Sequence, residues 1–429
     1  TLGCKVNQNE TGALAQLFEE NGYTVVSNEE GADVYIVNSC TVTNFGDQKS
    51  RKWLRRAKRE NPGAVTVLTG CYPQAFPDEA AEIAEADVVT GSGNRHAILT
   101  DVQKVLNGED ERVVDIRPHE KGERFEELPM DKFAEHTRAF VKVEDGCNRR
   151  CAYCVIPSLR GKFRSRTKES ILEEARLLAA SGVKELIIVA QDITRYGIDL
   201  YGKVCLTELL KELCKLDFRW VRLHYLYPEL IDDELIDEIA SEDKIVKYLD
   251  IPIQHINDTI LRRMNRRGTG EEIRALFKKL RERIPGLVLR TSLITGLPGE
   301  GEAEFEELCE FLREAKIERA GVFPFSPEEG TPAAKMPHAD ADTARQRAEL
   351  VNALQAEIMD EWERSLAGSV VEAICDEYDP EGNIARGRAY FDSPGIDGSV
   401  TFPGPCMPGD IVQLRVLSAE DGELSCEPI

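Results

Sequence analysis

The sequence predicts an α/β protein built in three parts, and the order of its patterns along the chain carries that prediction. Apolar runs alternate with amphipathic stretches through residues 1–107 and again through 134–364, which is typical of parallel strands joined by helices. A charged, irregular segment at 108–133 predicts a linker. Residues 365–429 hold short strand-like stretches set between glycine and proline. We therefore expect an N-terminal parallel α/β domain, a partial (β/α)6 barrel and a small antiparallel β-barrel.

The first domain is predicted from one βαβ pattern. "ADVYIVNSC" (32–40) and "AVTVLTGC" (64–71) are apolar runs of strand length. "NFGDQKSRKWLRRAKRE" (44–60) between them has helical spacing. The pattern indicates a small parallel sheet covered by helices.

The second domain is predicted from six repeats of strand and helix. Its candidate strands are "AFVKVED", "KELIIVAQD", "WVRLHYLYP", "KYLDIPIQ", "LVLRTSLITG" and "AGVFPFS". Helical patterns such as "KESILEEARLLAAS" lie between them. Serial βα units imply right-handed crossovers and a parallel sheet that closes into part of a barrel. In such barrels the chemistry lies at the carboxyl ends of the strands.

The third domain follows a predicted helix at 341–368. Its strand-like stretches are "SVVEAICDEYD", "NIARGRAYFD", "GSVTFPG" and "DIVQLRVLS". Short strands with turn residues between them favour a small antiparallel barrel.

Composition narrows the function classes. No run of about 18 apolar residues predicts a membrane span, and "TLGCKVNQNE" does not read as a signal peptide, so we expect a cytoplasmic protein without a membrane partner. Twelve cysteines then favour metal binding over disulfides. A net charge of −23 speaks against nucleic acid as the main partner. It favours a basic partner, or reflects solubility alone.

One cysteine triplet, Cys147, Cys151 and Cys154, has the spacing C-x3-C-x2-C directly after the first barrel strand. A structural zinc site closes with four protein ligands, whereas a cubane iron–sulfur cluster takes one thiolate per iron. Three thiolates therefore leave one iron open to a ligand that is not protein.

A second triplet, Cys4, Cys40 and Cys71, is spread over the first domain. Each cysteine follows an apolar run, so we expect each at the carboxyl end of a strand, where the three can converge. Buried cysteine is also ordinary core filling. Beside the first triplet, we interpret the second as another three-thiolate cluster site.

The first triplet in this position resembles the radical S-adenosylmethionine superfamily, and the two triplets together resemble its methylthiotransferases. Supporting stretches are "GCNRRCAYCVIPSLRGKFRSR", "LITGLPGE" and "FSPEEGTPA". The resemblance covers nearly the whole chain. It implies an N-terminal cluster-binding domain, a radical barrel and a C-terminal TRAM barrel. It also implies two [4Fe-4S] clusters and S-adenosylmethionine, with sulfur insertion at an unactivated carbon followed by methylation. Tyr153 matches the aromatic residue that packs near the adenine in that superfamily.

Further candidate residues lie at the predicted barrel mouth. Gln191, Asp192, Gln254 and His255 are expected to bind S-adenosylmethionine or substrate, although His255 reads equally well as a structural residue. Arg290 is interpreted either as a partner for a ligand carboxylate or as part of a salt bridge beneath the barrel. The remaining cysteines lack a partner motif and are interpreted as core or surface thiols.

The substrate divides the family into two branches. "AQDITRYGIDLYGK", "VRLHYLYPELI", "YLDIPIQHIN", "MNRRG" and "DSPGIDGSV" resemble the branch that modifies an aspartate of a small-subunit ribosomal protein. "TLGCKVNQNET" is closer to the branch that modifies transfer RNA adenosine. From 365 to 429 there are twelve acidic and three basic residues, a poor surface for RNA phosphates and a good one for a basic protein.

We therefore expect the ribosomal-protein substrate, with transfer RNA as the alternative. The basic stretch "RGKFRSR" (160–166) could steer a substrate. The reaction also implies an electron donor such as flavodoxin or ferredoxin, and a sulfur source. An iron–sulfur electron carrier or sensor is the non-enzymatic alternative, which the large barrel disfavours.

Overall fold

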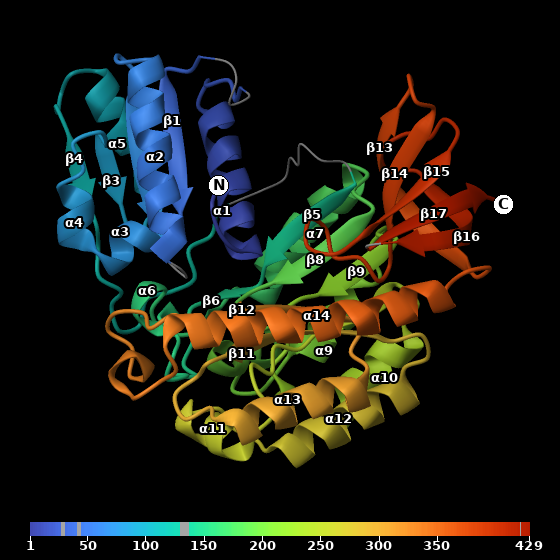
Figure 1. Cartoon of the computed structure of the whole chain (residues 1–429). Helices are drawn as coiled ribbons and strands as arrows, with labels where there is room; N and C mark the ends of the chain where they lie inside the picture. Colours follow the sequence, from blue (N-terminus) through green and yellow to red (C-terminus); the bar gives the residue numbers. More distant parts are fainter. Residues whose placement is uncertain (27–30, 41–43, 129–136, 421) are drawn as a thin grey trace.

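The computed structural model describes residues 1–26, 31–40, 44–128, 137–420 and 422–429. The end of the predicted linker and the start of the predicted barrel domain, at 129–136, lie outside the described residues. Figure 1 shows the N-terminal domain and the C-terminal barrel as two lobes above the central barrel.

The N-terminal domain is a four-stranded parallel sheet with order β1-β2-β3-β4. Its strands are β1 (Val34–Ser39), β2 (Val65–Gly70), β3 (Val88–Thr90) and β4 (Val113–Asp115). Its helices are α1 (Lys5–Glu20), α2 (Asn44–Glu60), α3 (Cys71–Ala75), α4 (Pro77–Ala81) and α5 (His96–Leu106). The predicted βαβ unit is confirmed. The predicted linker is not wholly irregular, because the valines of β4 extend the sheet from inside that charged segment.

The central domain is an open, six-stranded parallel sheet with order β12-β11-β10-β9-β8-β5, which confirms the predicted partial barrel. Its strands are β5 (Arg138–Lys142), β8 (Glu185–Val189), β9 (Trp220–Leu223), β10 (Ile245–Asp250), β11 (Val288–Thr295) and β12 (Arg319–Pro324). A two-stranded ribbon, β6 (Glu144–Asp145) and β7 (Arg164–Ser165), flanks the loop that carries the first cysteine triplet.

Helices cover the outer face of this sheet. The helices packed on it are α7 (Lys168–Ala180), α9 (Leu206–Leu213), α10 (Asp233–Ser241), α12 (Gly270–Arg283) and α13 (Glu302–Ala315). The connecting segments hold the short helices α6 (Ile156–Leu159), α8 (Ile198–Tyr201) and α11 (Asp258–Arg263) and the 3-10 turns η1 (Ile193–Arg195), η2 (Pro228–Leu230) and η3 (Ala333–Lys335). Local sequence sets several boundaries. Thr167 caps α7, Asn257 caps α11, and Thr269 forms a capping box with Glu272 at the start of α12.

The C-terminal domain is a closed five-stranded barrel with order β13-β14-β15-β17-β16. Its strands are β13 (Val370–Asp379), β14 (Ile384–Ala389), β15 (Ser399–Pro403), β16 (Ile411–Glu420) and β17 (Glu423–Pro428). Most pairs are antiparallel as predicted, but β15 and β17 pair in parallel and close the barrel. The long helix α14 (Ala341–Ser365) crosses the central domain and leads into it (Figure 1).

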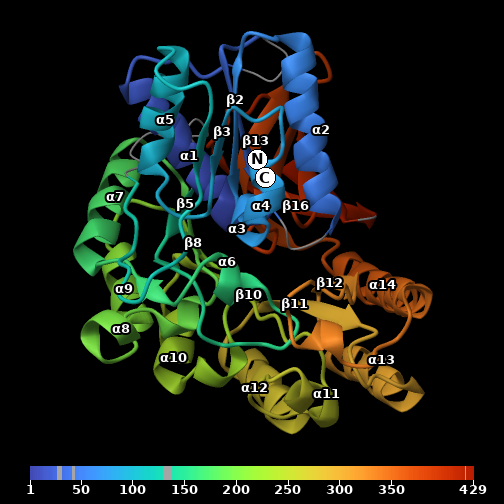
Figure 2. The ribbon, with the colours of Figure 1, turned by 90° about the vertical axis from the view of Figure 1, so that its left-hand side faces the viewer.

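The inner face of the partial barrel packs on the C-terminal barrel. Trp220, Tyr248 and Val288 share one buried cluster with C-terminal residues such as Phe391 and Val400. Figure 2 shows the C-terminal barrel behind the N-terminal sheet, so the two lobes stand on the same side of the central domain. In the part of the chain that the structure describes, none of the helices has the length and apolarity that a bilayer span requires.

Candidate active site

The first cysteine triplet lies on the loop that follows β6. Cys147 N donates to Gly161 O at 3.2 Å, and Cys154 N donates to Cys151 O at 3.0 Å. Gly146 begins the loop with φ of 77°. A Cβ atom there would lie 2.4 Å from the carbonyl oxygen of Lys162, so both its backbone conformation and its surroundings require glycine.

Two thiols of this loop have raised pKa values. Burial raises the pKa of Cys147 to about 11 and that of Cys154 to about 12. Cys151 adds to the pKa shifts of both Cys147 and Cys154, so its sulfur lies close to theirs. Such thiols are neutral at pH 7 without a metal, and iron that binds thiolate supplies the missing positive charge. The donor set therefore fits an iron–sulfur cluster.

Aromatic and cationic side chains surround this loop. The Tyr227 hydroxyl lies 3.7 Å from Cys151 Sγ. The guanidinium groups of Arg149 and Arg266 lie 3.7 Å and 4.5 Å from the centre of the Tyr227 ring. Arg266 also donates to the Tyr153 hydroxyl at 3.0 Å. Tyr153 is thus held beside the cysteines, and its contact with adenine stays a prediction.

Tyr227, Arg149 and Arg266 are site residues that the sequence did not predict. Arg149 lies in "NRR", Tyr227 in "HYLYP" and Arg266 in "MNRR". The contacts among these three side chains depend on the order of strands in the sheet. No local spacing indicates that they meet.

Polar atoms without partners lie at the adjoining strand ends. Asp192 accepts from Arg149 Nε at 2.8 Å and from Thr194 N at 3.2 Å. Among the described residues, Gln191 Oε1 and both carboxyl oxygens of Glu144 are buried and make no hydrogen bond. Burial, and then Asp192, raises the pKa of Glu144 well above its usual range. Unpartnered buried polar groups fit a polar ligand at this edge, as S-adenosylmethionine would be.

Of the other three predicted binding residues, His255 and Arg290 contact protein through their side chains, and Gln254 pairs through its backbone. Gln254 has φ of 71° and forms an isolated bridge with Leu293. His255 Nδ1 accepts from Asn257 N at 3.1 Å, and Nε2 lies 3.3 Å from Glu300. Arg290 donates to Asp250 at 2.8 Å, which matches its salt-bridge interpretation. Ligand binding by these three residues stays a prediction.

The second triplet gathers around Asn7. Cys4 Sγ lies 3.8 Å from Asn7 Oδ1, and Asn7 Nδ2 donates to Ser39 O beside Cys40. A Cβ atom at Gly3 would lie 2.9 Å from Cys40 Sγ, so this glycine leaves room for the sulfur. Burial raises the pKa of Cys71, and Cys4 is near enough to contribute. The structure therefore brings the three cysteines into one neighbourhood.

One expectation about this triplet is wrong. Cys4 does not end a strand; it stands at the N-terminus of α1, while Cys40 and Cys71 follow β1 and β2 as predicted. Leu2 N donates to Asn38 O, which brings Cys4 to the sheet edge.

Over the described ranges, no three His, Cys, Asp or Glu side chains converge tightly enough to hold a single metal ion. A cubane cluster does not require that, because each thiolate binds a different iron. Both triplets remain consistent with clusters rather than with mononuclear metal sites.

A segment after β9 connects the two triplets. Tyr227 contacts Cys151 of the first triplet. Tyr225, with φ of 64°, has its pKa raised by burial and then by Cys4 of the second. A bulky residue in the left-handed region is rare and marks a constrained site. The two cysteine sites therefore face one shared wall of the barrel mouth.

A loop of the C-terminal barrel contacts the elements around the two cysteine triplets. Ser393 Oγ lies 3.1 Å from His224 Nε2, and the Tyr248 hydroxyl donates to Asp397 at 2.5 Å. Lys5 Nζ, next to Cys4, donates to Pro394 O. The loop "DSPGIDG" thus touches the central barrel and the N-terminal domain at once.

The three arginines of the basic stretch 160–166 are buried. Arg160, Arg164 and Arg166 are 1%, 5% and 6% exposed. They pair with internal carboxylates such as Asp145 and Glu174. The three arginines therefore do not steer a substrate, whereas Lys162 is exposed and steering by it stays a prediction.

Comparisons with known proteins agree with this three-part organisation. The model of the Radical SAM superfamily matches residues 141–312, that of Uncharacterized protein family UPF0004 matches 1–91, and that of the TRAM domain matches 367–429. Ribosomal protein uS12 methylthiotransferase RimO of Lachnoclostridium phytofermentans is 39% identical, with 99% of this chain and 98% of that one covered. The RimO proteins of Geotalea uraniireducens (39%; 99% and 96%) and Geobacter sulfurreducens (40%; 100% and 97%) are similar over the same span. The chain belongs to the RimO methylthiotransferase family.

Solved structures support the fold alone. The radical S-adenosylmethionine methyltransferase TsrM from Kitasatospora setae aligns with a TM-score of 0.56 at 16% identity, covering 75% of this chain and 70% of that one. The cobalamin-dependent radical enzyme OxsB aligns at 0.51 and 13%, covering 84% and 55%.

Because the chain belongs to the RimO family, it is a radical S-adenosylmethionine methylthiotransferase. Enzymes of this family use [4Fe-4S] clusters and S-adenosylmethionine, as the sequence predicted. The C-terminal closed barrel is a TRAM domain, which confirms the predicted fold class.

Proposed function

We propose that this RimO-family enzyme adds a methylthio group to the β-carbon of an aspartate in ribosomal protein uS12. The observation that carries the proposal is identity of 39–40% over essentially the full length of relatives named uS12 methylthiotransferases. Because uS12 belongs to the ribosome, the proposal also places the enzyme in the cytoplasm.

Two cysteine triplets are assigned to two clusters. Cys147, Cys151 and Cys154 hold the cluster that binds S-adenosylmethionine, and Cys4, Cys40 and Cys71 hold the auxiliary cluster. When bound, these groups supply the electron, the hydrogen-abstracting radical, the sulfur and the methyl group. Glu144 and Gln191 provide unpartnered polar atoms for the cofactor's polar groups. Asp192 orients Arg149 through a 2.8 Å bond.

The described TRAM surface supports a basic protein partner. Its exposed acidic side chains are Glu377, Asp379, Glu381, Asp410, Glu420, Glu423 and Glu427. Its exposed arginines are already close to carboxylates. Arg386 lies 3.5 Å from Glu423, and Arg415 lies 3.8 Å from Glu427. Such a surface attracts a cationic protein and repels RNA phosphates.

The stretch "KVNQ", which resembled the transfer-RNA branch, is largely used inside the fold. Lys5 is 7% exposed and donates to Pro394 O, and Val6 and Asn7 are buried. Side chains occupied in this way are not available to an RNA substrate. This weakens the one sequence feature that favoured transfer RNA.

The proposal includes two further partners. An electron donor, such as flavodoxin or ferredoxin, must reduce the first cluster. A sulfur source must renew the sulfur that each turnover consumes. Both follow from the balance of the reaction.

The test offers both substrates in one tube. The protein is reconstituted anaerobically with iron and sulfide and given reductant, S-adenosylmethionine, a uS12 peptide that contains the aspartate loop, and unmodified transfer RNA. Mass spectrometry locates the added methylthio group. The proposal expects it on the peptide aspartate, and not on a peptide in which that aspartate is alanine. Modification of adenosine alone would contradict the proposal. Cys151→Ala should abolish either product.

A further inference from the structure

Arg160 links the two cysteine sites through the protein interior. It ends the loop that carries Cys154, directly after α6, and is 1% exposed. Its Nη2 lies 3.6 Å from Cys71 Sγ and donates to Asn7 Oδ1 at 2.6 Å. The same Asn7 oxygen lies 3.8 Å from the Cys4 thiol. A side chain from the first cluster's loop therefore contacts Cys71 of the second triplet directly and is connected to Cys4 through Asn7.

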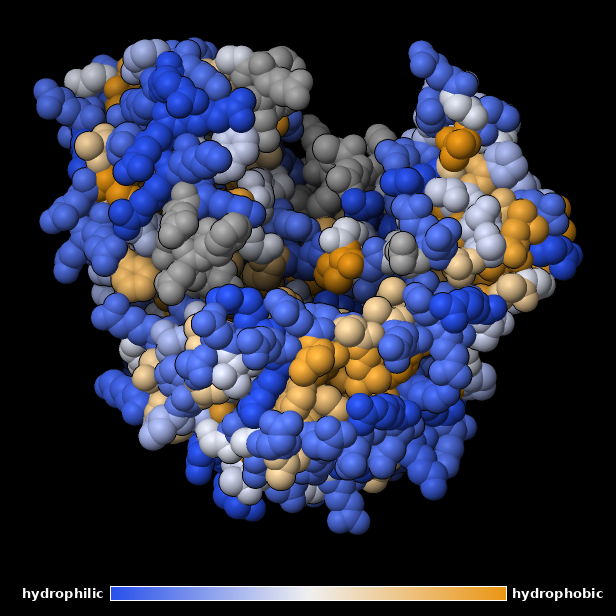
Figure 3. All heavy atoms as spheres, viewed as in Figure 1, coloured by the Kyte–Doolittle hydropathy of each residue, from blue (hydrophilic) through white to orange (hydrophobic). Residues whose placement is uncertain are grey.

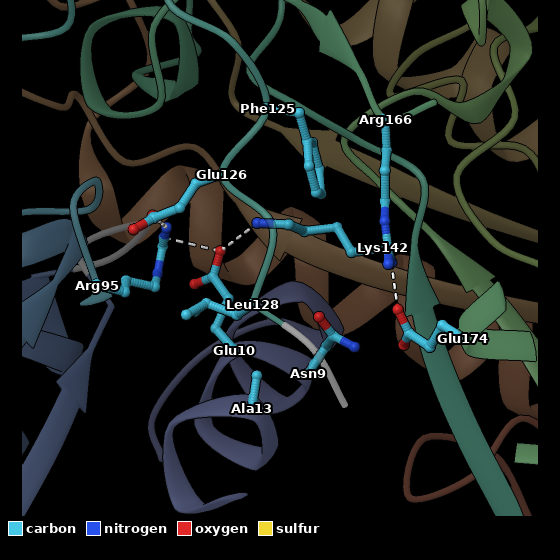
Figure 4. Close-up of a pocket in the computed structure, with 10 residues that line it drawn as sticks. All are labelled: Asn9, Glu10, Ala13, Arg95, Phe125, Glu126, Leu128, Lys142, Arg166 and Glu174. Atoms are coloured by element: carbon cyan, nitrogen blue, oxygen red, sulfur yellow. Dashed lines mark hydrogen bonds and ion pairs between the residues drawn. The ribbon is translucent and has the colours of Figure 1, made fainter. Parts of the chain in front are cut away.

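The carboxylates around Arg160 are shared with other cations. Glu10 is shared among Arg160, Arg95 at 2.8 Å and Lys142 at 2.9 Å. Figure 4 shows Arg95 and Lys142 pointing at Glu10 from different elements. Asp145, 3.5 Å from Arg160, is also shared with Lys142. Arg95 also pairs with Glu126 at 3.0 Å, so Arg160, Arg95 and Lys142 face the three carboxylates of Glu10, Asp145 and Glu126.

The side chains of this ion-pair network are packed together and do not line an open binding pocket. The cavity in Figure 4 measures about 20 Å³, which is room for one water molecule. Burial alone would raise the pKa of Glu10. The charges of Arg160, Arg95 and Lys142 outweigh burial and lower this pKa to about 2. Glu10 therefore stays ionised at neutral pH, and Arg160 keeps its charge beside Cys71.

We propose that Arg160 is a positioning residue for the auxiliary cluster, donating an N–H···S hydrogen bond to the Cys71 sulfur and raising that cluster's reduction potential. The inference rests on the proposed function, because it takes Cys4, Cys40 and Cys71 as ligands. Reduction adds an electron to a group made anionic by its thiolates. A cation and a hydrogen bond at one sulfur stabilise the reduced form more than the oxidised form.

The test isolates the auxiliary cluster in the full-length chain. In a background with Cys147→Ala, Cys151→Ala and Cys154→Ala, the midpoint potential is measured by redox titration followed by electron paramagnetic resonance. Arg160→Gln should shift the potential to a lower value with unchanged iron content. Arg160→Lys should shift it less in the same direction, since a lysine that pairs with Glu10 cannot also reach Cys71.

Arg95→Gln is the matched control. Arg95 is as buried as Arg160 and shares Glu10, but its ion-pair partners are the carboxylates of Glu10 and Glu126 rather than a thiol. A merely structural role of the network would make Arg95→Gln and Arg160→Gln alike. The inference expects the shift only, or mainly, in the Arg160 variants.

The outcomes separate the role of Arg160 from the proposed function. Equal potentials in the parent, Arg160→Gln and Arg160→Lys would overturn the role of Arg160 and leave the proposed function standing. If Arg160→Gln does not fold, the comparison between Arg160→Lys and the parent decides alone. A parent background that binds no iron would instead contradict the auxiliary cluster, and with it the proposed function.

Discussion

At the scale of single residues, the cysteine loop depends on positions that sequence motifs do not reveal. The spacing of Cys147, Cys151 and Cys154 predicted a three-thiolate site. It did not predict that Tyr227 reaches Cys151 from the segment after β9, or that Arg160 reaches Cys71 of the second triplet. It also made the arginines of 160–166 look like a surface patch, although they are buried and paired.

Gly146→Ala tests the loop. Its φ of 77° and the 2.4 Å approach of a Cβ atom to Lys162 O predict a loss of roughly 1–3 kcal/mol in stability. The first cluster should lose its iron, and the auxiliary cluster should keep its own. Iron assay and unfolding curves measure both effects.

Gly182→Ala is the control for Gly146→Ala. Gly182 also has positive φ, 91°, but a Cβ atom added there would have no described atom within 4 Å. This substitution should cost the backbone strain without affecting iron content. Equal iron loss in the two variants would contradict a specific role for the loop.

At the scale of elements, periodicity predicted the regular strands and failed for short or irregular ones. All six barrel strands lie where apolar runs predicted them. Strand β4 is three residues long inside a charged segment, too short to show a period. The parallel pair β15–β17 depends on how the small barrel closes, which no local pattern encodes.

A buried ion group joins strands β8, β9 and β14. Glu185 of the central barrel pairs with Arg222 and with Arg388 of the TRAM domain, and all three side chains are buried. Glu185→Gln should destabilise the docked TRAM domain by roughly 3–5 kcal/mol, because the buried Arg222 loses its carboxylate partner and Arg388 is left with Asp376. Denaturant unfolding checks this, with the exposed Glu377→Gln as a control of less than about 0.5 kcal/mol.

The same group predicts an acid dependence. Burial alone would raise the pKa of Glu185. The charges of Arg222 and Arg388 outweigh burial and lower this pKa to about 2. A depressed folded-state pKa contributes stability above the unfolded value of about 4.5, and that stability is lost as pH falls toward 2. The difference between wild type and Glu185→Gln should therefore shrink below about pH 4.5. A difference that stays constant from pH 7 to pH 3 would contradict this assignment.

At the scale of the whole molecule, the substrate hypothesis depends on the charge of the TRAM domain and on how that domain packs against the central barrel. The sequence predicted the order of the three domains and the acidity of the last one. It did not predict that the TRAM domain fills the inner face of the partial barrel, because that contact joins residues far apart in sequence. Figure 3 shows the molecule hollowed between the N-terminal and TRAM lobes, with mostly hydrophilic residues around the hollow.

Charge reversal on the TRAM hairpin tests substrate docking. Glu377→Lys, Asp379→Lys and Glu381→Lys together should raise the KM for uS12 by roughly tenfold at low salt, because steering depends on opposite charge. S-adenosylmethionine cleavage without substrate should be unchanged. The matched control is Glu271→Lys, Glu282→Lys and Glu306→Lys on α12 and α13. An equal rise in KM for the control would contradict TRAM docking.

The central claim, two separate three-thiolate clusters in one chain, is tested most directly by counting iron and sulfide after anaerobic reconstitution. We predict about eight irons per wild-type chain. We predict about four after alanine replaces Cys4, Cys40 and Cys71, and about four after it replaces Cys147, Cys151 and Cys154. Alanine at Cys205, Cys214 and Cys309, which are buried outside both triplets, should leave the count at about eight. Full iron in either triplet variant, or loss of a whole cluster in the control, would contradict the account.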